Sequence, residues 1–191
     1  FEWSPDSKKL LYHDKKFRLW LMDIDSKSQK LVDESGQGPI GDYSWSHDSK
    51  WITYVNPALG MSQISLYSLE TGKSTFITDN WYESGNPVFT RDGKYLVFSS
   101  SRSFSPTYSQ TEWNHVYQDM DKLYLVTLAS KTANPLGPKD DEVKLPEEKA
   151  DDSAEKKEAG KKDTDKKDDG EKAMVVDLDG IQERIIGLPV A

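Results

Sequence analysis

A phrase of nine to ten residues occurs three times in this chain and constrains its fold more than any other feature. The copies begin at Trp3, Trp45 and Phe89, so they lie 42 and then 44 residues apart. A repeat of about 40–45 residues with several short strands is the spacing of β-propeller blades. Because a propeller is a platform that hosts many activities, the period predicts a fold and leaves the function open.

Each copy of the phrase combines a turn with a strand. In Ser4-Pro5-Asp6-Ser7 the proline presets φ, and the aspartate can hydrogen-bond nearby backbone. Gly93 supplies the flexible turn residue in the third copy. A lysine and an apolar run follow every turn, which is typical of a strand. We expect the aspartates to form turns and not to act as catalytic acids: Asp6, Asp48 and Asp92. We expect the aromatic residues to fill the gaps between neighbouring sheets and not to bind a ligand: Trp3, Trp45 and Phe89.

Further strand signals complete each repeat. Apolar runs at residues 17–24, 63–69 and 122–128 are each followed by a polar turn and a shorter candidate strand, at 30–32, 75–77 and 134–136. Four strands in about 43 residues match one blade, and no long window shows helical apolar spacing. The chain is therefore predicted to be all-β. We expect a partial β-propeller over residues 1–138, with about three four-stranded blades of a seven-bladed ring.

Residues 139–172 differ from the rest of the chain in composition. Of these 34 residues 24 are charged and none is aromatic. Such a segment cannot bury enough apolar surface to offset its ordering entropy, so we expect a disordered insertion. A single solvated helix over 147–157 is the alternative. Residues 173–191 resume apolar patterning, with strand candidates at 174–180 and 184–190, and we expect a return strand and the start of the next blade there.

Several functional classes are disfavoured by composition. The chain has no cysteine, and its three histidines lie 34 and 68 residues apart, so no metal site is expected. No nucleophile elbow or phosphate-binding loop occurs. With a net charge of −8 and no basic stripe, nucleic-acid binding is not expected. No window reaches the length of a membrane span. We expect no catalytic residue, no cofactor, no nucleic-acid partner and no membrane contact.

The chain begins inside a strand and ends close to one, which suggests a piece of a longer protein. Three blades leave two open edges, and exposed sheet edges invite pairing. We expect these edges to pair with the remaining blades of the ring or with another copy of the chain.

The connection from residue 100 to residue 117 interrupts the repeat and is the expected place of function. A connection this long is usually functional or disordered, and its four aromatic residues disfavour disorder. In one interpretation the segment folds back and packs its aromatic rings on the blade. In the other, four side chains line a channel mouth and contact peptide: Arg102, Tyr108, Trp113 and Asn114.

The Trp-Ser-Pro-Asp-Ser-Lys repeat resembles the blades of TolB, the prolyl-oligopeptidase group and the tricorn proteases. Three details favour tricorn-like proteases: the Ser101–Tyr117 segment, the position of the charged insertion after Leu128, and the closing stretch from Asp177 to Val190. The resemblance covers essentially all residues that we expect to be ordered.

The resemblance implies a large serine peptidase that trims oligopeptides, with two propellers ahead of a PDZ-like module and a catalytic core. None of that core's nucleophilic or basic positions falls in this chain. The resemblance therefore implies a non-catalytic segment of the second propeller that filters and guides peptides, in the cytoplasm or, as an alternative, in the periplasm. Two other readings stay open: a TolB-like or scaffold propeller that binds proteins, and the propeller of a prolyl-oligopeptidase-type enzyme.

Overall fold

The computed structural model describes residues 1–58, 60–109, 114–138 and 174–190. The insertion predicted at 139–172 lies outside the described residues, as does Trp113.

Three antiparallel sheets of four strands each follow one another along the chain. The first blade contains β1 (Glu2–Trp3), β2 (Lys9–His13), β3 (Arg18–Asp23) and β4 (Gln29–Glu34). The second contains β5 (Gly41–Trp45), β6 (Trp51–Ala58), β7 (Met61–Ser68) and β8 (Lys73–Phe76). The third contains β9 (Ser84–Phe89), β10 (Tyr95–Ser100), β13 (Lys122–Thr127) and β14 (Ile185–Gly187). The all-β partial propeller is thus confirmed, while the number of blades in a full ring stays a prediction.

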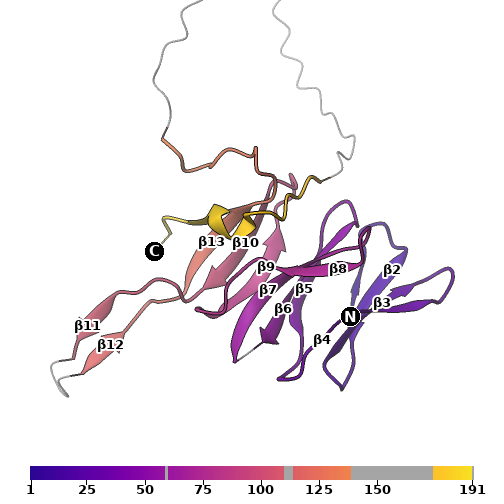
Figure 1. Cartoon of the computed structure of the whole chain (residues 1–191), viewed down its shortest axis with the longest axis horizontal. Helices are drawn as coiled ribbons and strands as arrows, with labels where there is room; N and C mark the ends of the chain where they lie inside the picture. Colours follow the sequence, from indigo (N-terminus) through magenta and orange to yellow (C-terminus); the bar gives the residue numbers. More distant parts are fainter. Residues whose placement is uncertain (59, 110–113, 139–173, 191) are drawn as a thin grey trace, which may run out of the picture.

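The sheets lie side by side (Figure 1), and the two gaps between them form the hydrophobic core. Between the first two blades, Leu11 and Leu19 pack with Ile52 and Tyr54, all fully buried. Between the second and third blades, fully buried side chains from both sheets form the other cluster: Ile64, Leu66, Ile77, Leu96 and Val126.

The turn of the repeated phrase has the same hydrogen bonds in all three blades. The aspartate accepts from the hydroxyl two residues before it, at 2.5 Å in Ser4–Asp6, 2.7 Å in Ser46–Asp48 and 2.6 Å in Thr90–Asp92. It also accepts from the backbone amide two residues after it, at 3.0–3.2 Å. The residue after the aspartate has positive φ in every copy: Ser7 at 58°, Ser49 at 57° and Gly93 at 65°.

The aromatic residue before each turn occupies the same pairing position in all three sheets, but it is packed in the core in two blades and exposed in the first. Trp3 pairs with Leu10, Trp45 with Ile52 and Phe89 with Leu96. Trp45 is 7% exposed in the core between the first two blades, and Phe89 packs against the core between the second and third. Trp3 is 50% exposed, so the expectation of burial is wrong for this residue: no described sheet covers its side of the first blade.

The outer strand of the third blade comes from a distant segment. Residues 134–136, where a strand was expected, form turns instead, and the strand candidate at 174–180 has no strand pairing. The outer strand is β14, which pairs Ile186 with Leu125 of β13. A short 3₁₀ helix, η1 (Ile181–Arg184), precedes it.

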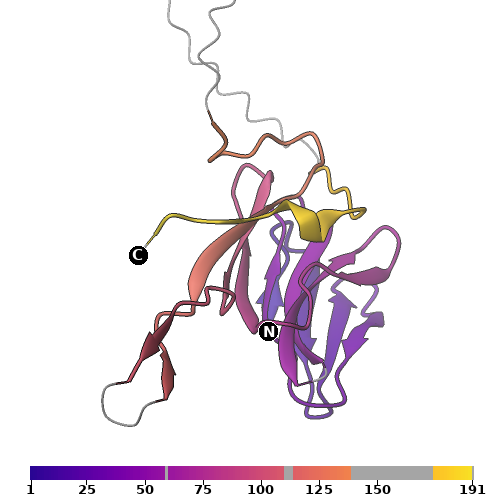
Figure 2. The ribbon, with the colours of Figure 1, turned by 60° about the vertical axis from the view of Figure 1, so that its left-hand side comes forward.

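The segment from Met174 to Leu188, here called the strap, crosses the second and third blades (Figure 2). Its Met174 amide donates to Asp48 Oδ2 at 2.9 Å, and Ile181 is 2% exposed in the core. Arg184 donates to backbone carbonyls on both sides: Thr127, Leu128, Asp177 and Asp179. These contacts hold β14 against β13.

The segment that interrupts the repeat forms a hairpin of β11 (Pro106–Tyr108) and β12 (His115–Tyr117). This two-stranded sheet is separate from the blades and extends away from them in both views (Figures 1 and 2). The rings of Phe104, just before β11, and of Tyr117, in β12, lie 5.2 Å apart, and the two residues are 64% and 52% exposed. The interpretation that the whole segment folds back onto the blade is therefore wrong for the hairpin.

Candidate functional site

A polar hollow lies between the second and third blades near the base of the hairpin, and we call it the rim hollow. It measures about 290 Å³. The starts of β5, β7 and β9 and the end of β10 contribute to it, because neighbouring blades bring equivalent strand ends together. Its polar lining consists mainly of hydroxyl, amide and carboxylate groups: Asp42, Ser62, Glu83, Ser84, Asn86, Ser99, Ser100, Ser101 and Asp121.

The carboxylates of the rim hollow are held by hydrogen bonds. Asp42 Oδ2 accepts from the backbone N–H of Asn86 at 3.3 Å, which ties the first strands of the two blades together. Glu83 Oε1 accepts from Ser62 Oγ at 3.0 Å, and Asp121 accepts a short hydrogen bond from Ser101. The hollow therefore presents oriented acceptors.

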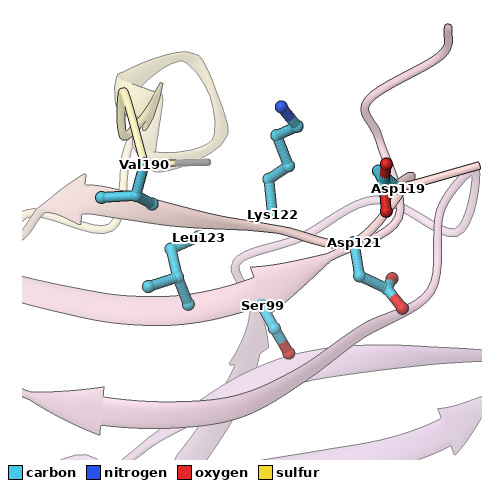
Figure 3. Close-up of a pocket in the computed structure, with 6 residues that line it drawn as sticks. All are labelled: Ser99, Asp119, Asp121, Lys122, Leu123 and Val190. Carbon is cyan, nitrogen blue, oxygen red and sulfur yellow. The ribbon is translucent and has the colours of Figure 1, made fainter.

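A second hollow, of about 410 Å³, lies on the other face of the third blade (Figure 3). Ser99 and Leu123 are cross-strand partners in its wall. Asp119 and Asp121, just before β13, and Val190, which follows β14, complete it together with Lys122. Ser99 and Asp121 line both hollows, so the end of β10 separates them.

Arg102, one of the four predicted peptide-contacting residues, is enclosed at the base of the hairpin. Its side chain is only 14% exposed and lies 3.9 Å from the Asp79 carboxylate. Its Nε donates to Ser100 Oγ at 3.1 Å. The guanidinium carbon lies 5.5–5.8 Å from three ring centroids, within cation–π range: Tyr82, Phe98 and Tyr124. Arg102 thus packs the hairpin base onto the third blade instead of lining an open mouth.

The same cluster affects Tyr124. Burial raises the pKa of the Tyr124 phenol, and the neighbouring Arg102 guanidinium acts in the opposite direction. A tyrosine phenol with a raised pKa is neutral near pH 7, so Tyr124 packs in this cluster as an uncharged ring.

Two of the other predicted residues lie on the hairpin. Tyr108, in β11, is 58% exposed, and Asn114 is exposed just before β12. Trp113 falls outside the described residues. The structure thus places Tyr108 and Asn114 on a projecting arm and separates them from the enclosed Arg102.

Sequence reasoning missed the rim carboxylates and Arg184. A signal for the former existed: Asp42 and Asn86 are 44 residues apart, like Trp45 and Phe89, and both have positive φ, at 45° and 52°. These residues mark the bulged start of the first strand in neighbouring blades, where the register of β5 and β9 shifts. Arg184 had no such signal, because its partners are backbone carbonyls.

The part of the chain that the structure describes has neither a metal-binding cluster nor a membrane-spanning helix. Within residues 1–58, 60–109, 114–138 and 174–190, no three side chains of His, Cys, Asp or Glu are grouped to hold a metal ion. In the same ranges no helix has the length and apolar character needed to cross a bilayer.

Three stacked four-stranded blades with one repeated turn define a β-propeller segment. The family model for the tricorn protease second β-propeller domain matches residues 1–191, so the chain belongs to that family. The tricorn-like protease C-terminal subunit of Sulfurisphaera tokodaii is 30% identical over 98% of this chain. The tricorn protease homolog of Saccharolobus solfataricus is 32% identical over 66% of this chain.

A solved structure supports the fold independently. The crystal structure of the tricorn protease superposes with a TM-score of 0.72, covering 98% of this chain at 19% identity. The chain spans only part of these proteins: 19% of the Sulfurisphaera relative, 12% of the Saccharolobus relative and 16% of the crystallised chain.

Proposed function

We propose that this chain is a non-catalytic propeller segment of a tricorn-type serine peptidase, where it guides peptides and supports the catalytic parts of the protein. One observation carries the proposal. The connection between β10 and β13 departs from the repeat, and it forms an exposed aromatic hairpin whose base adjoins the rim hollow at Ser101 and Asp121. Loops that depart from a rigid scaffold are the usual carriers of function.

The chemistry of this region suits an unfolded peptide. Extended peptide backbone offers unpaired N–H groups, and the rim hollow presents carboxylate and hydroxyl acceptors. The hairpin adds aromatic surface through Phe104, Tyr108 and Tyr117. A folded protein has already paired most of its backbone groups and cannot enter such a hollow. Selection would therefore be by unfolded state and size.

The roles of the four predicted residues differ in this proposal. Tyr108 and Asn114 contact the peptide, and Trp113 stays a prediction for the same role. Arg102 acts as the anchor that fixes the hairpin base, because it lies among the rings of the third blade. The peptidase activity resides in parts of the parent protein beyond this chain, which we expect to act in the cytoplasm.

The test uses the intact parent peptidase, with and without these three blades. We expect the intact enzyme to cleave short unstructured peptides and to spare a stably folded protein. Removal of the blades should reduce the difference in cleavage rate between unstructured peptides and the folded protein, because the blades no longer restrict access to the catalytic site. If the peptidase cleaved unstructured peptides and the folded protein at equal rates, both with and without the three blades, the proposal would be wrong.

A single substitution in the hairpin distinguishes a loss of peptide binding from a loss of protein stability. In the intact parent, Tyr108→Ala should raise KM for peptides several-fold and leave kcat unchanged, since a contact made equally in the ground and transition states affects binding alone. Phe76→Ala is the control, because Phe76 is similarly exposed at 41% but lies on β8, away from the hairpin. A loss of kcat in both variants would point to folding defects instead.

A further inference from the structure

Trp81 is 78% exposed although it lies between two described blades. Other exposed apolar residues, such as Trp3 and Val88, lie on the outer sides of the first and third blades, where further blades of a ring would pack. Trp81 does not belong to that group, because it lies in the connection from β8 to β9 and the gap between those two blades is filled by the core. Its exposure therefore does not depend on where the described blades begin and end.

The connection that carries Trp81 is fixed at its start by the second blade. Ile77 and Thr78 are both fully buried. The Ile77 N–H donates to the Ile64 carbonyl at 2.9 Å, and Thr78 Oγ1 accepts from the Ile64 N–H at 2.9 Å. Gln63 Nε2 donates to the Thr78 carbonyl at 3.0 Å. These contacts fix the place where the chain leaves the second blade.

The end of the connection is fixed to the base of the hairpin. The Glu83 carbonyl accepts from the Ser101 N–H at 3.0 Å and from Ser100 Oγ at 2.9 Å. The ring centroid of Tyr82 lies 5.5 Å from the guanidinium carbon of Arg102. The connection is therefore held at both ends, by the second blade and by the hairpin base.

Asp79 shapes the turn that presents Trp81 to solvent. Its Oδ1 accepts from the backbone N–H of Trp81 at 3.2 Å and lies 3.9 Å from Arg102 Nη2. One carboxylate thus contacts both the Trp81 turn and the residue that anchors the hairpin. A large ring on a fixed backbone loses little conformational entropy on binding, which is one reason why tryptophan is frequent among the residues that dominate binding energies.

Trp81 lies close to the rim hollow along the chain. Glu83, two residues further on, lines that hollow, and two residues of extended chain span at most about 7 Å. The neighbouring residues in the sequence are mostly polar, with Asp79, Asn80 and Glu83 within two positions. A tryptophan buries about 150–250 Å² in a contact, whereas an interface between domains needs about 600 Å² or more. The surface at Trp81 therefore fits one side chain of an extended peptide better than another domain.

We propose that Trp81 is a further specificity-determining residue, which contacts a large apolar side chain of a peptide whose backbone lies in the rim hollow. This inference rests on the proposed function and names its substrate class: unfolded peptides that carry aromatic or large aliphatic residues. In an extended peptide, alternate side chains point to the same side about 7 Å apart, which matches the spacing from the hollow to Trp81. Because such side chains are mostly buried in folded proteins, Trp81 adds to the selection of unfolded chains.

The experiment measures cleavage of polar, unstructured peptides by the intact parent peptidase. Leucine replaces serine at each position in turn without changing the cleaved bond, and kcat/KM for the leucine peptide is divided by that for the serine peptide. At one or more positions we expect this leucine ratio to be about three to ten and to come from KM. In Trp81→Ala the ratio should fall close to one, whereas Trp81→Phe should retain most of it.

Phe76→Ala is the matched control, because Phe76 is an exposed ring on β8, away from the hairpin. Its leucine ratio should equal that of the unchanged enzyme. An unchanged ratio in Trp81→Ala overturns the inference, and so does an equal fall in Phe76→Ala. A fall in kcat for all peptides alike in Trp81→Ala also overturns it, since Trp81 would then pack against another part of the parent protein.

Tyr108→Ala separates this inference from the proposed function on which it rests. That variant should raise KM for the leucine and the serine peptides by the same factor. If it does so while Trp81→Ala leaves the leucine ratio unchanged, peptide binding at the hairpin stands and only the role of Trp81 is wrong. If neither Tyr108→Ala nor removal of the blades alters cleavage, the proposed function is wrong and so is this inference.

Discussion

At the scale of single residues, the turn after the first strand of each blade tolerates different side chains because its neighbours differ. Ser7 and Ser49 accept positive φ with a side chain, whereas Gly93 has no room for one. A Cβ at Gly93 would lie 2.4 Å from His47 Cε1 and 3.3 Å from Met174 Cγ. The turns of the second and third blades thus pack directly on each other through Gly93.

Gly93→Ala should lower the free energy of unfolding by about 1–3 kcal/mol, from backbone strain and displacement of His47. Ser7→Gly relieves the same backbone conformation at an exposed site and should be neutral or stabilising by a few tenths of a kcal/mol. Denaturant unfolding checks both. Adding His47→Ala to Gly93→Ala should restore part of the lost unfolding free energy, because it removes the side chain that the new methyl group would meet. If nothing is restored, the contact with His47 is not the cause of the loss.

Asp48 links two elements and should give the stability a measurable pH dependence. Partial burial opposes ionisation, but hydrogen bonds from Ser46 Oγ and from the Met174 and Lys50 amides hold the pKa of Asp48 below its ordinary value. Because the folded-state pKa is lower than the unfolded one, the stabilisation is complete above about pH 4 and is lost as pH falls through the folded value.

Asp48→Asn should therefore cost about 1–2 kcal/mol at pH 7 and progressively less below pH 4. Asp92→Asn is the comparison, because Asp92 has the same turn contacts with Thr90 and Lys94 and lies in a more exposed turn. Unfolding curves at several pH values measure the difference. A cost for Asp48→Asn that is constant from pH 7 to pH 2 would contradict this assignment.

At the scale of elements, the blade strands were predictable and the origin of the last strand was not. The first two blades follow from local chemistry repeated along the chain. Residues 134–136 and 185–187 are both short candidates for the third blade's outer strand. The choice depends on contacts that no local pattern shows, such as the Ser130 amide donating to Asp177 at 2.8 Å.

The candidate site was predictable to a similar degree. The interruption at 100–117 correctly marked where the fold departs from its repeat. The enclosure of Arg102 was not foreseeable, because its three ring partners come from β10, β13 and the connection before β9. The exposure of Trp3 likewise depends on what lies beside the first blade and not on the phrase that contains it.

The strap should depend on the shape of Arg184 and not only on its charge. The guanidinium spans carbonyls of Thr127, Leu128 and Asp179 at 3.1–3.3 Å, which a single ammonium cannot do. Arg184→Lys should speed hydrogen exchange in β13 and β14 at least several-fold and leave the first blade unchanged. Arg91→Lys, in an exposed turn of the same blade, is the control. Uniform exchange changes across all blades would contradict a local role.

At the scale of the whole molecule, the strap rejoins the body after residues 139–173 and is held by non-covalent contacts. Trypsin under native conditions should cut among the lysines of 139–172, if that stretch is the solvated insertion that its composition predicts. The two pieces should then elute together, because Met174 and Ile181 are buried in the core. Release of the strap on gel filtration, or resistance of 139–172 to cleavage, would contradict this view.

We propose that this propeller segment binds peptides at the hairpin and the rim hollow without cleaving them. Titration of the isotopically labelled chain with an unstructured peptide, followed by two-dimensional NMR, tests it most directly. We expect chemical-shift changes at Tyr108, Asn114 and Ser99–Ser101, with the peptide shown to be intact by mass spectrometry. Absence of shifts at saturating peptide, shifts confined to the first blade, or cleaved peptide would contradict it.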